Sequence, residues 1–259
     1  MTKSRMVLFL LMVAVMTPSF AYAMSGRDVY DKVQEMRTRM LDRKTEAVMV
    51  LYDRGGGKRT RTLTEYCKSI SLDAYKILLV FNSPPDLKGV GFLLHARTLA
   101  DRDLWAYFPE YKRIRRIPTA SQDDSFFGSD FSYDDFSGPP NLDDYSFKIL
   151  RDETVDGKPC HVIEVAPKTP HKYTRYVAWV AKNLWITTKI EYYQEKELYR
   201  SGSFRDIRVI DGFPTPFEIE MENHKTRHRT ELTIKTIRYG ANFPDKLFTQ
   251  RALERGGGQ

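Results

Sequence analysis

Apolar and polar residues alternate along most of this chain, and this period of two constrains the fold more than any other feature. In the stretch 217–222, Phe, Ile and Met alternate with three Glu residues, which indicates a strand with one buried and one solvated face. Turn signals, such as the glycines at 55–57 and the Asp-Gly pair at 156–157, separate one run from the next. The runs follow one another too closely for helical crossovers, so the sequence predicts an antiparallel, meandering sheet. Comparable runs occupy 45–53, 58–71, 73–82, 89–96, 102–108, 112–117, 145–151, 160–166, 186–193 and 197–207.

Helical periodicity is found near the two ends of this pattern. The segment 25–41 opens with Ser25 and Asp28, a capping-box pattern, and repeats Val and Met on one face. A shorter helix is predicted at 245–253, directly after a proline. Because a large sheet must hide its inner face, we predict a mainly β (α+β) fold with a curved antiparallel sheet that forms an unclosed β-barrel. We expect the two helices and an aromatic loop at 119–140 to cover the concave side.

Residues 1–23 have the features of a secretory signal peptide. Lys3 and Arg5 precede an apolar run at 6–16, and Ala-Tyr-Ala at 21–23 fits a cleavage site. We therefore expect export to the periplasm and a single domain over 24–259. The net charge of +7 is a mild basic excess, which suits an anionic membrane surface or an acidic partner. Export argues against a nucleic-acid partner, and we expect a monomer.

The stretch 105–136 combines cations, carboxylates and aromatic rings. Four cations between positions 112 and 116 precede a loop rich in Asp, Phe and Tyr. Loops are normally polar, so these rings either fold over a core or line an apolar cavity. The Asp residues could bind Ca²⁺, but they lack the spacing of an EF-hand loop. We favour ion pairs between them and Arg113, Arg115 and Arg116, and we predict no metal site.

Motifs for catalysis or cofactor binding are weak. His224 and His228 are four residues apart, but no acidic residue completes a zinc-protease motif, so we predict two surface histidines. No GxSxG nucleophile elbow occurs, and the glycines at 55–57 lack the spacing of a phosphate-binding loop. We therefore predict no enzymatic activity and no cofactor. For Cys67 and Cys160, a disulfide and two buried thiols both remain open.

Several of these segments also carry a family likeness. They are PDLKGVGFLL at 85–94, WAYFP at 105–109, RRI at 115–117, GSDFSYDD at 128–135 and DGKPC at 156–160. Together they resemble the outer-membrane lipoprotein-sorting protein family, the LolA-like periplasmic carriers. The resemblance implies an unclosed barrel with a hydrophobic cavity for acyl chains and a role in lipid or lipoprotein traffic between the inner and outer membranes. It also implies an inner-membrane transporter of the resistance-nodulation-division (RND) type as partner.

A lined cavity can extract a lipid without covalent chemistry, because each buried methylene contributes roughly 0.8 kcal/mol. We accordingly predict a periplasmic lipid or lipoprotein carrier, with Arg115 and Arg116 contacting lipid phosphates or an anionic membrane. The alternative is a periplasmic sensor that detects lipids or lipoproteins and binds a membrane partner. The residues predicted to line the cavity are Phe81, Leu93, Trp105, Tyr107, Phe127 and Phe131.

Overall fold

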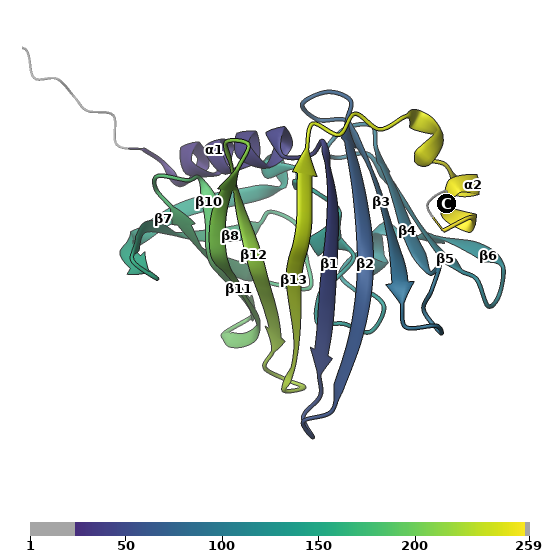
Figure 1. Ribbon diagram of the computed structural model, residues 1–259. Coiled ribbons are helices and arrows are strands. Elements are labelled where there is room, and N and C mark those ends of the chain that lie inside the picture. Colours follow the sequence, from purple (N-terminus) through teal and green to yellow (C-terminus); the bar gives the residue numbers. More distant parts are fainter. Residues whose placement is uncertain (1–23, 257–259) are drawn as a thin grey trace, which may run out of the picture.

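One antiparallel sheet of thirteen strands dominates the fold (Figure 1). The computed structural model describes residues 24–256, and the predicted signal peptide lies outside these residues. The sheet is curved and unclosed, which confirms the predicted fold class. The strands are β1 (Arg43–Tyr52), β2 (Lys58–Ser69), β3 (Tyr75–Ser83), β4 (Gly91–Ala96), β5 (Arg102–Phe108), β6 (Arg113–Ile117), β7 (Tyr145–Val155), β8 (Lys158–Pro167), β9 (Arg175–Ala181), β10 (Ile186–Gln194), β11 (Glu197–Ile210), β12 (Phe213–Asn223) and β13 (His228–Tyr239).

The strand order explains why a single connection must cross the sheet. Strands β1 to β6 run outward as hairpins to one edge, and β7 to β13 return from the other edge until β13 pairs with β1. The chain therefore leaves the sheet at β6 and re-enters it at β7, on the opposite edge. Residues 118–144 make this connection. We call the face that they cross the inner face, and we call the connection itself the plug.

The inner face holds the largest apolar cluster, to which strands, plug and the first helix all contribute. Helix α1 (Gly26–Arg39) places Val29 and Val33 in this cluster and packs against β7 and β10. As predicted, Ser25 and Asp28 form a capping box, in which the Asp28 N–H donates to the Ser25 hydroxyl at 3.2 Å. The helix and the plug thus cover the inner face side by side, one over the β7 half and the other over the β3–β5 half.

The C-terminal helix covers the opposite face, which differs from our expectation. Helix α2 (Gln250–Glu254) packs on β4 and β5 through Leu253, in a second cluster with Leu78, Leu93 and Tyr107. Figure 1 shows α2 outside the curve of the sheet. Successive strand residues point to opposite faces. Strands β3 to β5 carry apolar residues at both odd and even positions, so each of their faces can be packed against another element. Within residues 24–256, neither helix is long and apolar enough to span a bilayer.

Candidate functional site

The tip of the plug is a tight turn closed by its own hydrogen bonds. Ser125 and Ser132 form an isolated bridge, and the Phe126 N–H donates to the Phe131 carbonyl at 2.8 Å. Between them the chain reverses at Phe127 and Gly128, whose φ angles of 49° and 77° are both left-handed. A bulky residue seldom adopts this conformation, so the aromatic side chain at position 127 is held there at some conformational cost.

Aromatic rings of the plug fill the space above the inner face. Phe126 is fully buried, and its ring centroid lies 4.3 Å from that of Phe136 and 5.7 Å from that of Phe92 on β4. Phe127 packs edge-on against Phe81 of β3 at 5.3 Å. Such edge and tilted arrangements are favourable for aromatic pairs, in addition to the area they bury. The plug is therefore a hydrophobic insert made by a loop, and no strand hydrogen bonds tie it into the sheet over its aromatic part.

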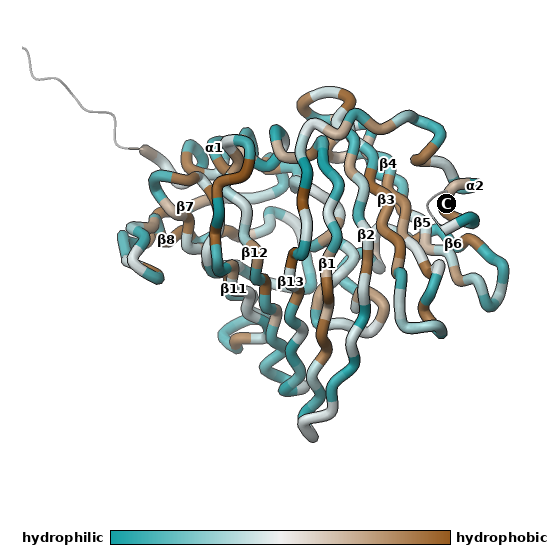
Figure 2. The backbone as a smooth tube through the Cα atoms, viewed as in Figure 1, coloured by the Kyte–Doolittle hydropathy of each residue, from teal (hydrophilic) through white to brown (hydrophobic). Residues whose placement is uncertain are grey.

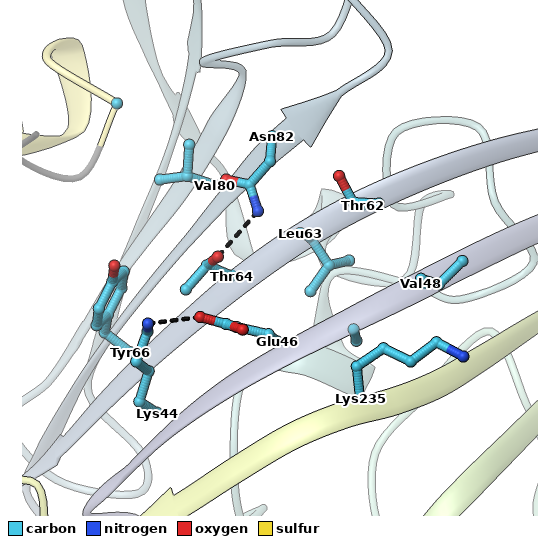
Figure 3. A pocket seen from close by; sticks show the side chains of 12 residues that line it. Lys44, Glu46, Val48, Thr62, Leu63, Thr64, Tyr66, Val80, Asn82 and Lys235 are labelled. Atoms are coloured by element: carbon cyan, nitrogen blue, oxygen red, sulfur yellow. Dashed lines mark hydrogen bonds and ion pairs between the residues drawn. The ribbon is translucent and has the colours of Figure 1, made fainter.

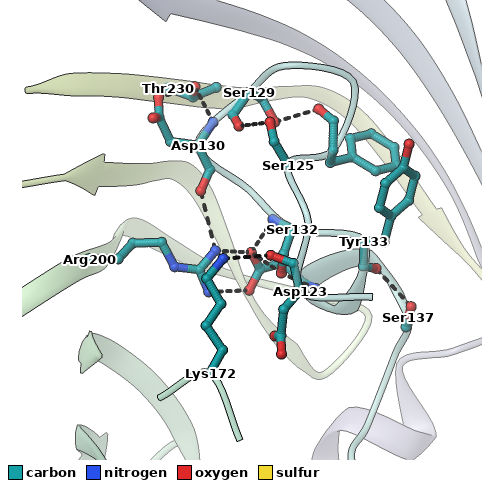
Figure 4. A network of polar contacts seen from close by, with 12 residues as sticks. Asp123, Ser125, Ser129, Asp130, Ser132, Tyr133, Ser137, Lys172, Arg200 and Thr230 are labelled. Atoms are coloured by element: carbon teal, nitrogen blue, oxygen red, sulfur yellow. Dashed lines mark hydrogen bonds and ion pairs between the residues drawn. The ribbon is translucent and has the colours of Figure 1, made fainter. Parts of the chain in front are cut away.

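A buried ion pair anchors the plug to the middle of the sheet (Figure 4). The Arg200 guanidinium on β11 donates to the Asp135 carboxylate at 2.7 Å, and only 4% of Arg200 is exposed. The same cation stacks over the Tyr192 ring at 4.1 Å. Burial by itself would lower the pKa of Arg200, but the Asp135 charge and the neighbouring tyrosines raise it above its ordinary value. Asp135 also accepts a hydrogen bond from the Ser132 N–H at 2.7 Å.

A second anchor joins the plug tip to the sheet through a reciprocal pair of hydrogen bonds. The Asp130 N–H donates to the Thr230 hydroxyl at 3.0 Å, and that hydroxyl donates to the Asp130 carboxylate at 2.7 Å. Burial raises the pKa of Asp130 above its ordinary range. Arg61 on β2 also donates to the Phe127 carbonyl at 2.7 Å. The tip is thus held from both sides of the β1–β13 seam, where the two halves of the sheet meet.

Further contacts hold the two ends of the plug. The Tyr75 hydroxyl donates to the Ser137 carbonyl at 2.6 Å, and the next residue, Gly138, lies directly against the tyrosine ring. Gly138 has a φ of 80°, and a Cβ there would sit 2.7 Å from a ring carbon, so only glycine fits. At the other end, Asp123 contacts His171 Nε2 at 3.1 Å, and its carbonyl accepts from Lys172 Nζ at 2.9 Å.

These partners correct our prediction for the acidic residues. The carboxylates of the plug contact Arg200, Arg102, Thr230 and His171, not the cations of β6. Arg116 instead pairs with Asp103 of the neighbouring strand, a residue that also binds Arg97. The prediction failed because closeness in sequence does not set the partners here: Arg116 points to the outer face and Arg113 and Arg115 are exposed, whereas the plug lies on the inner face, where its carboxylates meet Arg102 of β5 and Arg200 of β11.

The residues predicted to line a cavity are divided between the two faces. Phe81, Phe127 and Phe131 belong to the inner-face cluster. Leu93, Trp105 and Tyr107 instead lie in the outer cluster beneath α2. The register pairs Leu93 with Trp105, so the parity of the strands places them together on the outer face. The prediction that all six line one surface is corrected, and three of the six remain as candidates.

Arg115 and Arg116 are separated for the same reason. Arg116 pairs with Trp105 in the register and points to the outer face, where it is bound to Asp103. Arg115 points to the inner side of the edge strand and is exposed. The two guanidinium groups therefore do not form one headgroup site.

Both cysteines are free thiols in the structure. Cys67 is buried in the inner-face cluster, whereas Cys160 lies in a third cluster under β8 to β10. Of the two alternatives that the sequence left open, the structure has the buried thiols. Burial raises the pKa of Cys67, which disfavours its reactive thiolate. Over the described part of the chain, no three His, Cys, Asp or Glu side chains gather as metal ligands would.

A groove of about 460 Å³ lies on the outer face, beside the C-terminal segment (Figure 3). Its lining is mixed: Lys44 pairs with Glu46 at 2.6 Å, and Asn82 donates to Thr64 at 2.9 Å. Figure 3 shows these polar groups spread across the floor of the groove. Sites for acyl chains are predominantly apolar, so the inner face fits such a ligand better than this groove does.

Sequence reasoning missed the residues that anchor the plug from the sheet. Arg200 carried a weak signal, because it falls within a predicted strand; it is buried like Gly202 two positions on, whereas Leu198 is exposed because the pairing with β10 shifts between Tyr192 and Tyr193. A charge at a buried strand position needs a partner, and the acidic loop is an obvious source. Thr230 carried no comparable signal.

Comparisons with known proteins agree with this fold. Residues 73–255 match a protein family described as "Uncharacterized protein". The chain belongs to this family. A crystal structure of a lipoprotein-sorting protein domain from Vibrio parahaemolyticus is similar, with a TM-score of 0.82 and 27% identity over 89% of this chain and 98% of that one. A DUF1329 family protein from Desulfovibrio piger gives a TM-score of 0.81 and 29% identity over 88% of this chain and 99% of its own.

The fold is therefore that of the LolA-like, lipoprotein-sorting proteins, as the sequence motifs had indicated. A LolA superfamily protein from Nitrosomonas europaea shares this fold with a TM-score of 0.69 and 19% identity, over 89% of this chain and 100% of that one. No curated protein sequence matches the chain.

Proposed function

We propose that this LolA-like protein is an exported, non-catalytic carrier that binds lipid or lipoprotein acyl chains on its inner face. It would act as a monomer in the periplasm and transfer its cargo between the inner and outer membranes together with a membrane transporter of the RND type. The observation that carries the proposal is the plug. It is an aromatic loop that fills the inner face and is anchored by side-chain contacts, so it can be displaced as a unit.

The energetics of exchange are balanced. Burying a Phe side chain contributes about 1.5–3 kcal/mol, so the two most buried plug phenylalanines, Phe126 and Phe131, contribute roughly 3–6 kcal/mol. An acyl chain that buries about ten methylenes contributes roughly 8 kcal/mol. The chain can therefore replace the rings on Phe81 and Phe92 of the sheet, although the anchors must also break. Closed and loaded states of similar free energy are what a carrier needs to take up and release cargo.

A reversible crosslink tests whether the plug must move. The Thr230 hydroxyl, whose place a Cys sulfur would take, lies 3.0 Å from the Asp130 backbone nitrogen and 2.7 Å from its carboxylate, so an Asp130→Cys/Thr230→Cys variant is the pair chosen to join the plug tip to β13. We expect wild-type protein and the reduced variant to bind a fluorescent fatty acid, and the oxidised variant to lose binding until reductant is added. The single variant Thr230→Cys, treated identically, is the control.

Two outcomes would contradict the proposal at different points. If the oxidised variant binds the probe as well as the reduced one, lipid does not enter by displacing the plug. If the wild-type protein binds no probe, and native mass spectrometry of protein purified from its own cell envelope shows no bound lipid, the carrier function itself is wrong.

A further inference from the structure

Positive charge gathers in the turns at one end of the sheet. We call basic rim the exposed Lys and Arg residues of the turns 53–59, 84–90, 109–113, 168–174, 195–197 and 224–227, which all join strands at the same end of the antiparallel sheet (Figure 1). The same turns contain carboxylates at Asp53, Asp86, Glu110, Glu195 and Glu197, and Asp123, Asp143 and Asp144 of the plug lie beside the 168–174 turn, so that cations still outnumber carboxylates at this end. The basic rim consists of Arg54, Lys58, Arg59, Lys88, Lys112, Arg113, Lys168, Lys172, Lys196, Lys225 and Arg227.

The strand pairing makes these turns neighbours along a continuous band. The Thr174 N–H donates to the Tyr193 carbonyl at 2.8 Å, which joins the β8–β9 and β10–β11 turns. The His224 N–H donates to the Tyr199 carbonyl at 3.0 Å and extends the band to the β12–β13 turn. The pairing of β1 with β13 then brings in the β1–β2 hairpin, which lies beside the β12–β13 turn at the lower end of Figure 1. Figure 2 shows hydrophilic residues at these hairpin ends.

The rim cations form no close ion pairs. Across residues 24–256, none of them has a carboxylate oxygen within 4.0 Å, although most charged residues of the sheet are paired. At the opposite end of the sheet, the turn cations Arg97 and Lys182 are bound to Asp101 and Asp152 at 2.6 and 2.7 Å. The positive field therefore points out of one end of the molecule, where it attracts an anionic surface.

The plug tip reaches the sheet at this same end. Arg61, which holds the Phe127 carbonyl, lies two residues beyond Arg59 of the rim. Thr230, which holds Asp130, follows the 224–227 turn on β13. Lys172 belongs to the rim and itself donates to the Asp123 carbonyl of the plug. The basic rim thus surrounds the end of the inner face from which the plug tip would leave.

We propose that the basic rim docks this protein on an anionic phospholipid bilayer and presents the plug end of the inner face to the lipid surface. The choice of a bilayer over an acidic protein rests on the proposed carrier function, because an acyl cargo enters and leaves through a membrane. A broad band of separate cations without close ion pairs suits a planar anionic surface. Each Lys or Arg near such a surface strengthens binding by about fivefold, and the attraction falls off within a Debye length.

Vesicle co-sedimentation with charge-matched variants tests the assignment. The rim variant is Arg54→Glu/Lys196→Glu/Lys225→Glu, at exposed turn positions that hold no plug contact. The control variant makes the same change of charge away from the rim, at Lys235, Arg238 and Lys246, all exposed and without a carboxylate partner among the described residues. With vesicles of phosphatidylcholine and phosphatidylglycerol, we expect the rim variant to bind at least about 100-fold more weakly than wild type, because three attractions of about fivefold each are lost and the new carboxylates are repelled. The control should bind within a few fold of wild type.

The outcomes separate the docking surface from the carrier function. The assignment would be overturned if the rim and control variants bound the anionic vesicles equally well. It would also be overturned if wild type bound pure phosphatidylcholine vesicles as well as it binds vesicles that contain phosphatidylglycerol. Fatty-acid probe uptake is measured in parallel without vesicles, where we expect both variants to match wild type. If wild type takes up no probe, but the rim substitutions still weaken binding to anionic vesicles, the carrier proposal fails and the docking surface stands.

Discussion

The ion pair between Asp135 and Arg200 gives the sharpest test of how the plug is held. An Asp135→Ala variant removes the carboxylate and leaves the guanidinium of Arg200, which is 4% exposed, without its charged partner. Removing one member of a buried pair typically costs about 3–5 kcal/mol, because the remaining charge stays desolvated. The Ser132 N–H also loses its acceptor. For a chain of this length we expect the melting temperature to fall by roughly 10 °C.

The measurement is reversible unfolding in urea, followed by tryptophan fluorescence and circular dichroism. Asp31→Ala is the matched control, since it breaks an exposed ion pair with Arg27 at 2.8 Å and should change the free energy of unfolding by less than about 0.5 kcal/mol. A double variant, Asp135→Ala/Arg200→Met, should lose less stability than Asp135→Ala alone, because no buried charge remains.

Three results would refute this reasoning. The first is that Asp135→Ala lowers the free energy of unfolding no more than Asp31→Ala does. The second is that the double variant is less stable than Asp135→Ala. The third is that Asp135→Ala takes up the fatty acid more slowly than wild type. The last would mean that loosening the plug does not open the inner face.

Other predictions follow from the glycine, carboxylate and thiol environments of the chain. Gly138→Ala should cost clearly more stability in urea than Gly157→Ala, since both positions have left-handed φ angles but only a Cβ at 138 meets a tyrosine ring; equal costs would contradict this. Burial raises the pKa of Asp130, so its stabilising protonation is complete below about pH 4 and is lost as the pH rises through the raised pKa. Asp130→Asn should therefore be at least as stable as wild type at pH 7, with a gap that shrinks toward pH 4, and a gap independent of pH would count against it. Cys67 and Cys160 should resist thiol reagents in the folded protein and both react in denaturant, whereas an intact mass lower by two hydrogen atoms would indicate a disulfide.

Much of the fold could be predicted from local sequence, because local pattern has a local physical cause. Alternation with a period of two identifies strands, since successive side chains point to opposite faces whatever the partner strand is. The Ser25–Asp28 cap and the glycine-containing turns are likewise set by residues within four positions of one another. The sequence also marked residues 119–140 as an apolar loop, which is the segment that the structure places on the inner face.

The faces and the partners depended on the tertiary structure. The alternation indicates that Leu93 shares a face with the residues two positions away, but it does not indicate which face is the inner one. Leu93, Trp105 and Tyr107 were therefore predicted to line the cavity, whereas they lie in the outer cluster. The acidic residues were assigned to nearby cations, whereas Asp135 finds its partner 65 residues away and Asp130 finds Thr230 at a separation of 100 residues.

The sequence by itself thus determined the elements, the capped helix and the aromatic character of the plug. Only the tertiary structure decided that β1 pairs with β13 and that β6 and β7 form opposite edges of the sheet. That arrangement forces residues 118–144 across the inner face, toward Arg200 and Thr230 on distant strands. The physical reason is that many of these strands could pair with one another in several registers. The arrangement adopted is the one that buries the most apolar surface over the whole chain, and no single segment encodes that choice.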